Sequence, residues 1–327
     1  MLRIFHNTSF DFIRWWRWAA GLTIAFIVAG LATFAVTGGV NYSIEFTGGT
    51  LMQAQFKQPP KVDDIRATVD QAGFRGAEIT QFGQNTEYTV RAHSGESVSA
   101  GDSTAKRIGA VLHQKFGDNV TVLRSEYVGP RVGAELQRNA VIALLISFAV
   151  TLVYLAIRFE WRFGVAAVVA TAHDLLATLA FLAMMRLEVS LTVVAALLTV
   201  IGYSLNDTII IFDRVRENLR KGRKESLRDL LNRSINETLP RSVLTHATTL
   251  AATLALLIFA GEVIRPFSWI MTFGIFTGTF SSVYVAGALL LWIENRWPRP
   301  SGAERKGAAR AVAEGKRQRV EDPVGTP

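Results

Sequence analysis

Six long apolar segments limit what this chain can fold into. Each is close to or above the roughly 20 residues that an α-helix needs to cross the hydrocarbon core of a bilayer. Backbone polar groups find no water in that core, so each segment is expected to be a continuous helix. The sequence therefore predicts an α-helical polytopic membrane protein. The predicted spans cover residues 18–37, 139–157, 163–185, 189–212, 243–261 and 267–292.

Basic residues predict how these helices are oriented. The net charge is +8, and lysines and arginines gather in the N-terminal segment 1–17, the connection 213–242 and the tail 293–327. Because positive loops stay on the cytoplasmic side, both termini are expected in the cytoplasm, and topology explains the charge better than nucleic-acid binding does. The basic tail is expected to be disordered. A cleaved signal peptide is the alternative for the first apolar segment.

Residues 38–131 form a polar insertion between the first and second spans. Their hydrophobic periodicity predicts the order strand, helix, strand, strand, helix, strand. This order is typical of a small α+β ferredoxin-like domain, and the charge pattern places it on the extracytoplasmic side. The expected strands are 50–56, 77–82, 87–91 and 120–127, and the expected helices are 62–72 and 102–116.

The fourth span carries an amide and a carboxylate side by side, Asn206 and Asp207. An Asp at the centre of a membrane helix costs about 2.5 to 3.5 kcal/mol, so such residues usually face a bundle interior and mark an ion or proton path. The alternatives are that Asp207 lies close enough to the cytoplasmic interface to be solvated, or that it only forms a hydrogen bond in helix packing.

Polar residues at the start of the fifth span suggest a partner for Asp207. Arg241, Thr245 and Thr248 share one helical face, so an ion pair between Asp207 and Arg241 across two packed helices is sterically reasonable. A change in their separation would load or unload a proton on Asp207. The alternatives are a static ion pair, or an interfacial Arg241 that reaches lipid phosphate.

His173 and Asp174 interrupt the third span. A second element of a proton relay and a packing hydrogen bond between helices are equally good interpretations of this pair. Earlier in the chain, the pair Gly48 and Gly49 is too short to count as a nucleotide-binding motif. They are expected to allow close backbone packing, or a bend where the chain leaves the membrane.

The sequence lacks the patterns that most enzymes need. It has no cysteine, no nucleophile paired with a general base, no glycine-rich loop with lysine and no metal-ligand spacing. We therefore expect neither an enzyme nor a cofactor. If the protein performs work, an ion gradient is the expected energy source.

Several motifs together resemble the SecF branch of the SecD/SecF family of protein-export membrane proteins. The resemblance covers nearly the whole chain. Three positions depart from the family pattern, which usually has Asp at Glu45, Ser at His246 and Tyr at Phe280. The motifs are residues 44–50, His173 with Asp174, 202–218, 232–239 leading to Arg241, and 278–282.

The resemblance implies a six-helix half-bundle related to resistance-nodulation-division (RND) transporters, in the inner membrane. Such a subunit pairs with SecD and promotes preprotein export by the SecYEG translocon after the SecA-driven step, using the proton motive force. YajC, YidC and membrane lipids are further expected partners. The residues implied for the proton path are Asp207, Arg241, Asn206, His173, Asp174, Thr245 and Thr248, and the other motif residues are Gly202, Tyr203, Ser204, Asp213, Arg214, Gly48 and Gly49.

Two other functions stay open at this stage. A proton-coupled half-transporter for small molecules could use the same membrane fold. A non-transporting assembly scaffold for Sec components is the third interpretation, and it should tolerate the loss of the charge on Asp207.

Overall fold

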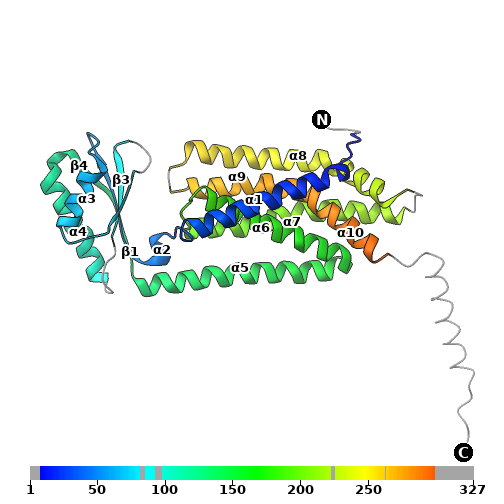
Figure 1. Cartoon of the computed structure of the whole chain (residues 1–327), viewed down its shortest axis with the longest axis horizontal. Helices are drawn as coiled ribbons and strands as arrows, with labels where there is room; N and C mark the ends of the chain where they lie inside the picture. The colour runs from blue at the N-terminus through cyan, green and yellow to red at the C-terminus, as the bar shows by residue number, and fades with distance from the viewer. Residues whose placement is uncertain (1–7, 82–84, 93–97, 222–224, 262, 299–327) are drawn as a thin grey trace, which may run out of the picture.

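The structure is a computed structural model that describes residues 8–81, 85–92, 98–221, 225–261 and 263–298. A bundle of long helices lies beside a small domain of strands and helices, as Figure 1 shows. The predicted basic tail lies almost entirely outside the described residues, and so does part of the segment 1–17.

Six helical segments are long and apolar enough to cross a membrane, which confirms the predicted count. A short 3-10 helix, Ile13–Trp15, leads into the first of them, and the last is interrupted by a π-helical turn, Ser282–Ala286. The helices are α1 (Trp16–Val36), α5 (Pro130–Arg158), α6 (Trp161–Met184), α7 (Leu191–Arg220), α8 (Leu227–Phe259), α9 (Arg265–Ser281) and α10 (Gly287–Arg296).

The charged connection 213–242 between the fourth and fifth spans is mostly helical. Helix α7 continues to Arg220, and α8 already begins at Leu227. Arg, Glu, Lys and Leu are good helix formers. Glu217 also forms ion pairs along α7 with Arg214 at 2.6 Å and with Lys221 at 2.7 Å, which support the helix beyond the apolar segment.

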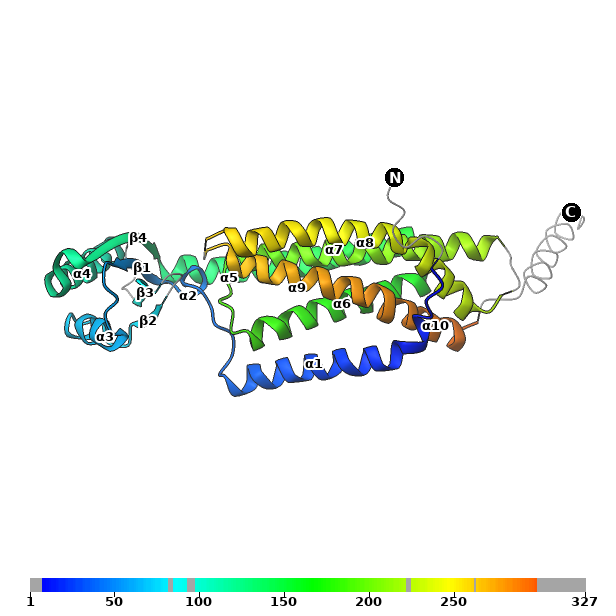
Figure 2. The same cartoon turned by 90° about the horizontal axis from the view of Figure 1, so that it is seen from above.

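Helices α6, α7 and α9 make the centre of the bundle, while α1 lies at one edge (Figure 2) and α5 at another (Figure 1). Two glycines let α9 approach α7 closely. A Cβ atom at Gly278 would lie 3.1 Å from the Cβ of Ser204, and one at Gly274 would clash with Val200. Small residues at such contacts are typical of membrane helix packing, and here they bring α9 next to the polar residues of α7.

The small domain has the predicted ferredoxin-like order of elements. Its four strands form one antiparallel sheet in the order β2-β3-β1-β4, and its core combines one face of the sheet with both helices. The elements are β1 (Gly49–Phe56), α3 (Val62–Gln71), β2 (Glu78–Gln81), β3 (Glu87–Ala92), α4 (Val98–Phe116) and β4 (Val120–Val128).

A short helix, α2 (Ile44–Thr47), and a pair of glycines connect this domain to the bundle. Gly48 and Gly49 have φ angles of 71° and 129°, which residues with a side chain rarely adopt. A Cβ at Gly48 would also lie 2.7 Å from the Cα of Pro130, the first residue of α5. The glycine pair thus makes the close-packed bend that the sequence predicts.

The loop between α6 and α7 ties the sheet domain to the membrane helices. Arg91 of β3 forms an ion pair with Glu188 at 2.6 Å. Backbone hydrogen bonds join Val189 to Asn41 at 2.7 Å and to Ser43 at 2.9 Å. These contacts hold the sheet domain and the segment before it against the end of the bundle.

Candidate functional site

Asp207 lies in the middle of α7 and is 2% exposed. Its Oδ1 accepts a hydrogen bond of 2.9 Å from the hydroxyl of Ser242 on α8. Its Oδ2 is buried and has no hydrogen-bond partner. One oxygen of the buried carboxylate is therefore hydrogen-bonded, and the other is not.

His246 of α8 lies opposite the free oxygen of Asp207. Its Nδ1 is 3.9 Å from Oδ2 of Asp207, and this nitrogen is also buried without a hydrogen-bond partner. Tyr203 of α7 packs edge-on against the imidazole, with 5.4 Å between ring centroids. The sequence showed His246 only as a departure from the family pattern, and nothing in the sequence indicated that it faces Asp207.

The structure does not form the expected ion pair between Asp207 and Arg241. Arg241 is exposed, and its neighbour Ser242 takes the place against Asp207. Successive residues of a helix point about 100° apart, so turning Ser242 and His246 toward α7 turns Arg241 away from it. Thr245 and Thr248 share the face of Arg241, as predicted, but both bond to carbonyls of their own helix.

Asp174 forms a second buried polar cluster where α6, α7 and α9 meet. It is 1% exposed, and its Oδ2 accepts hydrogen bonds from Ser281 at 2.6 Å and from Ser204. Its Oδ1 contacts Nδ1 of His173 at 3.0 Å. The two serines come from distant parts of the sequence, and a single sequence does not reveal such partners.

Ser204 places the two carboxylates in one polar layer of the bundle. It bonds to Asp174 and lies one turn before Asp207 on the same face of α7. Thr208 and Ser282 extend this layer with a hydrogen bond of 3.0 Å. Tyr203 adds a bond of 2.9 Å from its hydroxyl to Thr249, on the side toward the sheet domain.

Other predicted residues lie outside this layer. Asn206 and Gly202 are exposed on another face of α7. Asp213 and Arg214 lie nearer the charged end of α7, where Asp213 pairs with Arg158 at 2.8 Å and Arg214 with Glu237 at 2.6 Å. Gly48 and Gly49 belong to the bend described above. No group of three or more potential metal ligands occurs among the residues that the structure describes.

Family models and solved structures both match this chain. A model described as "Protein export membrane protein SecD/SecF, C-terminal" matches residues 108–296, and one described as "SecD/SecF GG Motif" matches residues 33–60. The protein translocase subunit SecF of Gemmatimonas aurantiaca is 63% identical over 317 residues, which are 95% of each chain. The SecF of Escherichia coli O157:H7 is 39% identical and covers 86% of this chain and 87% of its own.

The fold is similar to that of SecDF. The crystal structure of SecDF from Thermus thermophilus matches with a TM-score of 0.79 and 38% identity over 89% of this chain. A SecDF structure in the super-membrane-facing form matches with a TM-score of 0.64 over 94% of this chain. The chain spans 39% and 40% of those two SecDF chains.

Proposed function

The chain belongs to the SecD/SecF family of protein-export membrane proteins, and we propose that it couples proton movement to protein export as a SecF subunit. It is a membrane subunit of a translocase and not an enzyme. The observation that carries the proton coupling is Asp207, a buried carboxylate whose second oxygen has no donor.

A carboxylate in this environment suits reversible protonation. Charge is costly inside a bilayer unless it is paired, while a protonated carboxyl group is neutral and can donate a hydrogen bond. Ser242 stabilises the charged form through Oδ1, and Oδ2 is free to take the proton. One charge crossing a potential of about 100 mV releases about 2.3 kcal/mol, which is enough to shift a two-state membrane protein.

We also assign His246 to this path. A small rotation of either side chain would close the 3.9 Å gap between its Nδ1 and Oδ2 of Asp207 into a hydrogen bond. Tyr203 and Thr249 continue the polar contacts from there toward the end of the bundle that carries the sheet domain. A proton arriving from that end would meet His246 before Asp207.

The exposed polar face of α7 supports association with SecD. Asn206 lies within an apolar segment yet is exposed, as is Arg241 on α8. Polar side chains at such depth rarely face lipid, so a second membrane subunit is expected to cover them. In that assembly Arg241 is covered by the partner subunit and keeps its proposed role in the proton path, next to Ser242.

The charge pattern supports an inner-membrane orientation with both termini in the cytoplasm and the sheet domain outside. The further partners in this proposal are SecYEG, the emerging preprotein, YajC, YidC and the surrounding lipids. The domain boundaries are proposed as 1–17, 18–37, 38–131, 132–292 and 293–327, with 213–242 as the cytoplasmic connection.

Export of a reporter preprotein in cells depleted of their own SecF tests the proposal. Asp207→Asn keeps the shape of the side chain and removes its titration, so we expect normal membrane levels and SecD co-purification with loss of proton-driven export. Asp229→Asn makes the same chemical change at an exposed position of α8 and should retain export.

The outcomes separate the three candidate functions. Normal export with Asp207→Asn would reject proton coupling at this residue and favour a scaffold. Loss of proton-coupled uptake of a small molecule, with normal preprotein export, would favour a half-transporter.

A further inference from the structure

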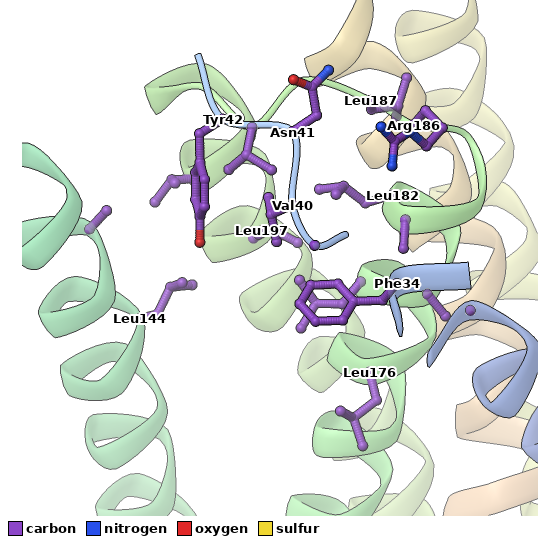
Figure 3. A pocket seen from close by; sticks show the side chains of 18 of the residues that line it. Phe34, Val40, Asn41, Tyr42, Leu144, Leu176, Leu182, Arg186, Leu187 and Leu197 are labelled. Carbon is purple, nitrogen blue, oxygen red and sulfur yellow. The ribbon is translucent and has the colours of Figure 1, made fainter. Parts of the chain in front are cut away.

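An apolar cavity of about 310 Å³ opens between α1, α5, α6 and α7, near the end of the bundle that carries the sheet domain. Its volume falls at the lower end of the range of small-molecule sites, about 300 to 1,000 Å³. Figure 3 shows Leu144 of α5 on one side of the cavity and Phe34 and Leu176 on the other.

We propose that this cavity binds one acyl chain of a phospholipid, with the phosphate of the lipid on the guanidinium of Arg186. The proposal concerns a ligand site and is independent of the proton path. Three observations carry it: the cavity opens between exposed apolar faces of α1 and α5, its walls are apolar, and the charged side chain of Arg186 stands at one end.

The cavity joins the lipid phase through the faces of α1 and α5. Leu31 of α1 and Val141 of α5 both line it, and they are 59% and 52% exposed. Outward residues on both helices, such as Leu22 and Leu145, are likewise apolar and exposed. If the cavity were empty, its walls would lose dispersion contacts. Lipid acyl chains are the apolar groups available at its opening, so we expect one of them to fill it.

The rim supplies the charge that a phospholipid headgroup needs. Arg186 follows the end of α6 and is exposed, and no carboxylate pairs with it among the described residues. Its guanidinium donates a hydrogen bond of 3.3 Å to the carbonyl of Thr37. Figure 3 places the side chain of Asn41 at the same end of the cavity. A guanidinium at the edge of an apolar site suits a phosphate, because its planar fork matches two phosphate oxygens.

The backbone conformation of Arg186 allows a substitution that removes its charge without straining the fold. Its φ angle is 53°, and it is the one non-glycine residue with a positive φ among those described. Glycine adopts this conformation without strain. Arg186→Gly therefore removes the charge while relieving the backbone, so a purely structural loss would not follow from it.

Native mass spectrometry of the purified full chain, titrated with palmitoyl-oleoyl phosphatidylglycerol, tests the site. We expect one saturable lipid adduct. Ala140→Phe fills the cavity from α5 and should weaken the adduct at least about tenfold, while Ala149→Phe, on an exposed turn of α5 that does not line the cavity, should leave it unchanged.

Arg186→Gly should weaken phosphatidylglycerol binding about tenfold, the effect of one lost charge-assisted contact, without lowering the unfolding temperature. Binding of a diacylglycerol, which has the chains but no phosphate, should not change in this variant. Equal binding by Ala140→Phe and Ala149→Phe would overturn the proposal. A second pair of results would also overturn it: SecD binding displaces the lipid, and Ala140→Phe no longer co-purifies with SecD. The cavity would then be a binding site for the partner subunit.

Discussion

Oδ2 of Asp207 and Nδ1 of His246 face each other at 3.9 Å across α7 and α8, and neither atom has a hydrogen-bond partner. Buried polar atoms nearly always have a hydrogen-bond partner. Two buried atoms that lack one and lie this close together indicate that a hydrogen bond between them can form and break. A proton or a small rotation of a side chain would join them.

Replacing His246 tests whether this contact carries protons. His246→Ala is expected to reduce proton-driven export about tenfold, which is less than the roughly 10²- to 10⁴-fold that a positioned acid or base contributes in catalysis. His246→Ser should recover export to a greater degree than His246→Ala, because a hydroxyl can hold a water in the gap. The measurement is reporter export at matched membrane levels, over a range of external pH.

The control for His246 is His113→Ser on α4. His113 is exposed in the sheet domain, far from the bundle interior, and its loss should leave export unchanged. Full export by His246→Ala at every pH would remove His246 from the proton path, while a loss with Asp207→Asn alone would keep Asp207 in it.

Ser281 offers a test of the second buried cluster. Ser281→Ala removes one donor to the carboxylate of Asp174, and the group cannot find water in its place. An unsatisfied buried partner costs about 1 to 3 kcal/mol, so the unfolding temperature should fall by several degrees. Thr279→Ala, on the same helix, removes a hydroxyl that bonds only to its own backbone and should have a smaller effect. Equal losses in the two variants would show that the bond from Ser281 to Asp174 adds no stability.

Much of the fold follows from local patterns. The six spans could be predicted because lipid demands long apolar helices, and the sheet domain because its elements alternate with the periods of strands and helices. The predicted fourth span ends at residue 212 with the apolar segment, whereas α7 continues to Arg220. In fact, ion pairs such as Glu217 with Lys221 stabilise helix beyond the apolar segment.

The candidate site was harder to predict than the fold. Asp207 and Asp174 stand out because carboxylates are rare in membrane spans. Their partners depend on how neighbouring helices rotate, and one residue along α8 separates Ser242, which bonds to Asp207, from Arg241, which does not. Sequence periodicity shows which residues share a face, but it does not show which face meets α7.

Asp11 predicts a pH dependence for the contact between the N-terminal segment and α8. Burial acts to raise the pKa of Asp11, but hydrogen bonds from Asn232 and the Arg14 N–H, with the charge of Arg228, lower the pKa below its usual value. A lowered pKa stabilises the folded state at pH values above the ordinary pKa. This stability is lost as the pH falls through the folded pKa, which lies below about 4.

Thermal unfolding of Asp11→Asn and the wild type measures this effect. The wild type should be slightly more stable near pH 6, and the difference should shrink as the pH falls through the folded pKa of Asp11. Arg228→Gln removes the ion pair of 2.9 Å from the other side and should show a loss of the same sign near pH 6. A difference that grows as the pH falls would contradict the contact.

The ion pair between Arg91 and Glu188 predicts how firmly the sheet domain sits on the bundle. Arg91 is 14% exposed in its side chain and also contacts Glu78 at 3.1 Å, so this pair is shielded more than an ordinary surface bridge. Arg91→Gln leaves Glu188 without its charge partner and should broaden the range of domain positions. Electron paramagnetic resonance distances between spin labels at Thr80 and Thr199 would report that spread. The exchange of Arg91→Glu with Glu188→Arg, made together with Glu78→Gln so that the new carboxylate meets no like charge, should restore a narrow distribution because it rebuilds the pair with its charges reversed. If Arg91→Gln gives the same distribution as the wild type, the ion pair does not set the position of the domain, and the backbone bonds of Val189 and the packing of Gly48 on Pro130 are sufficient.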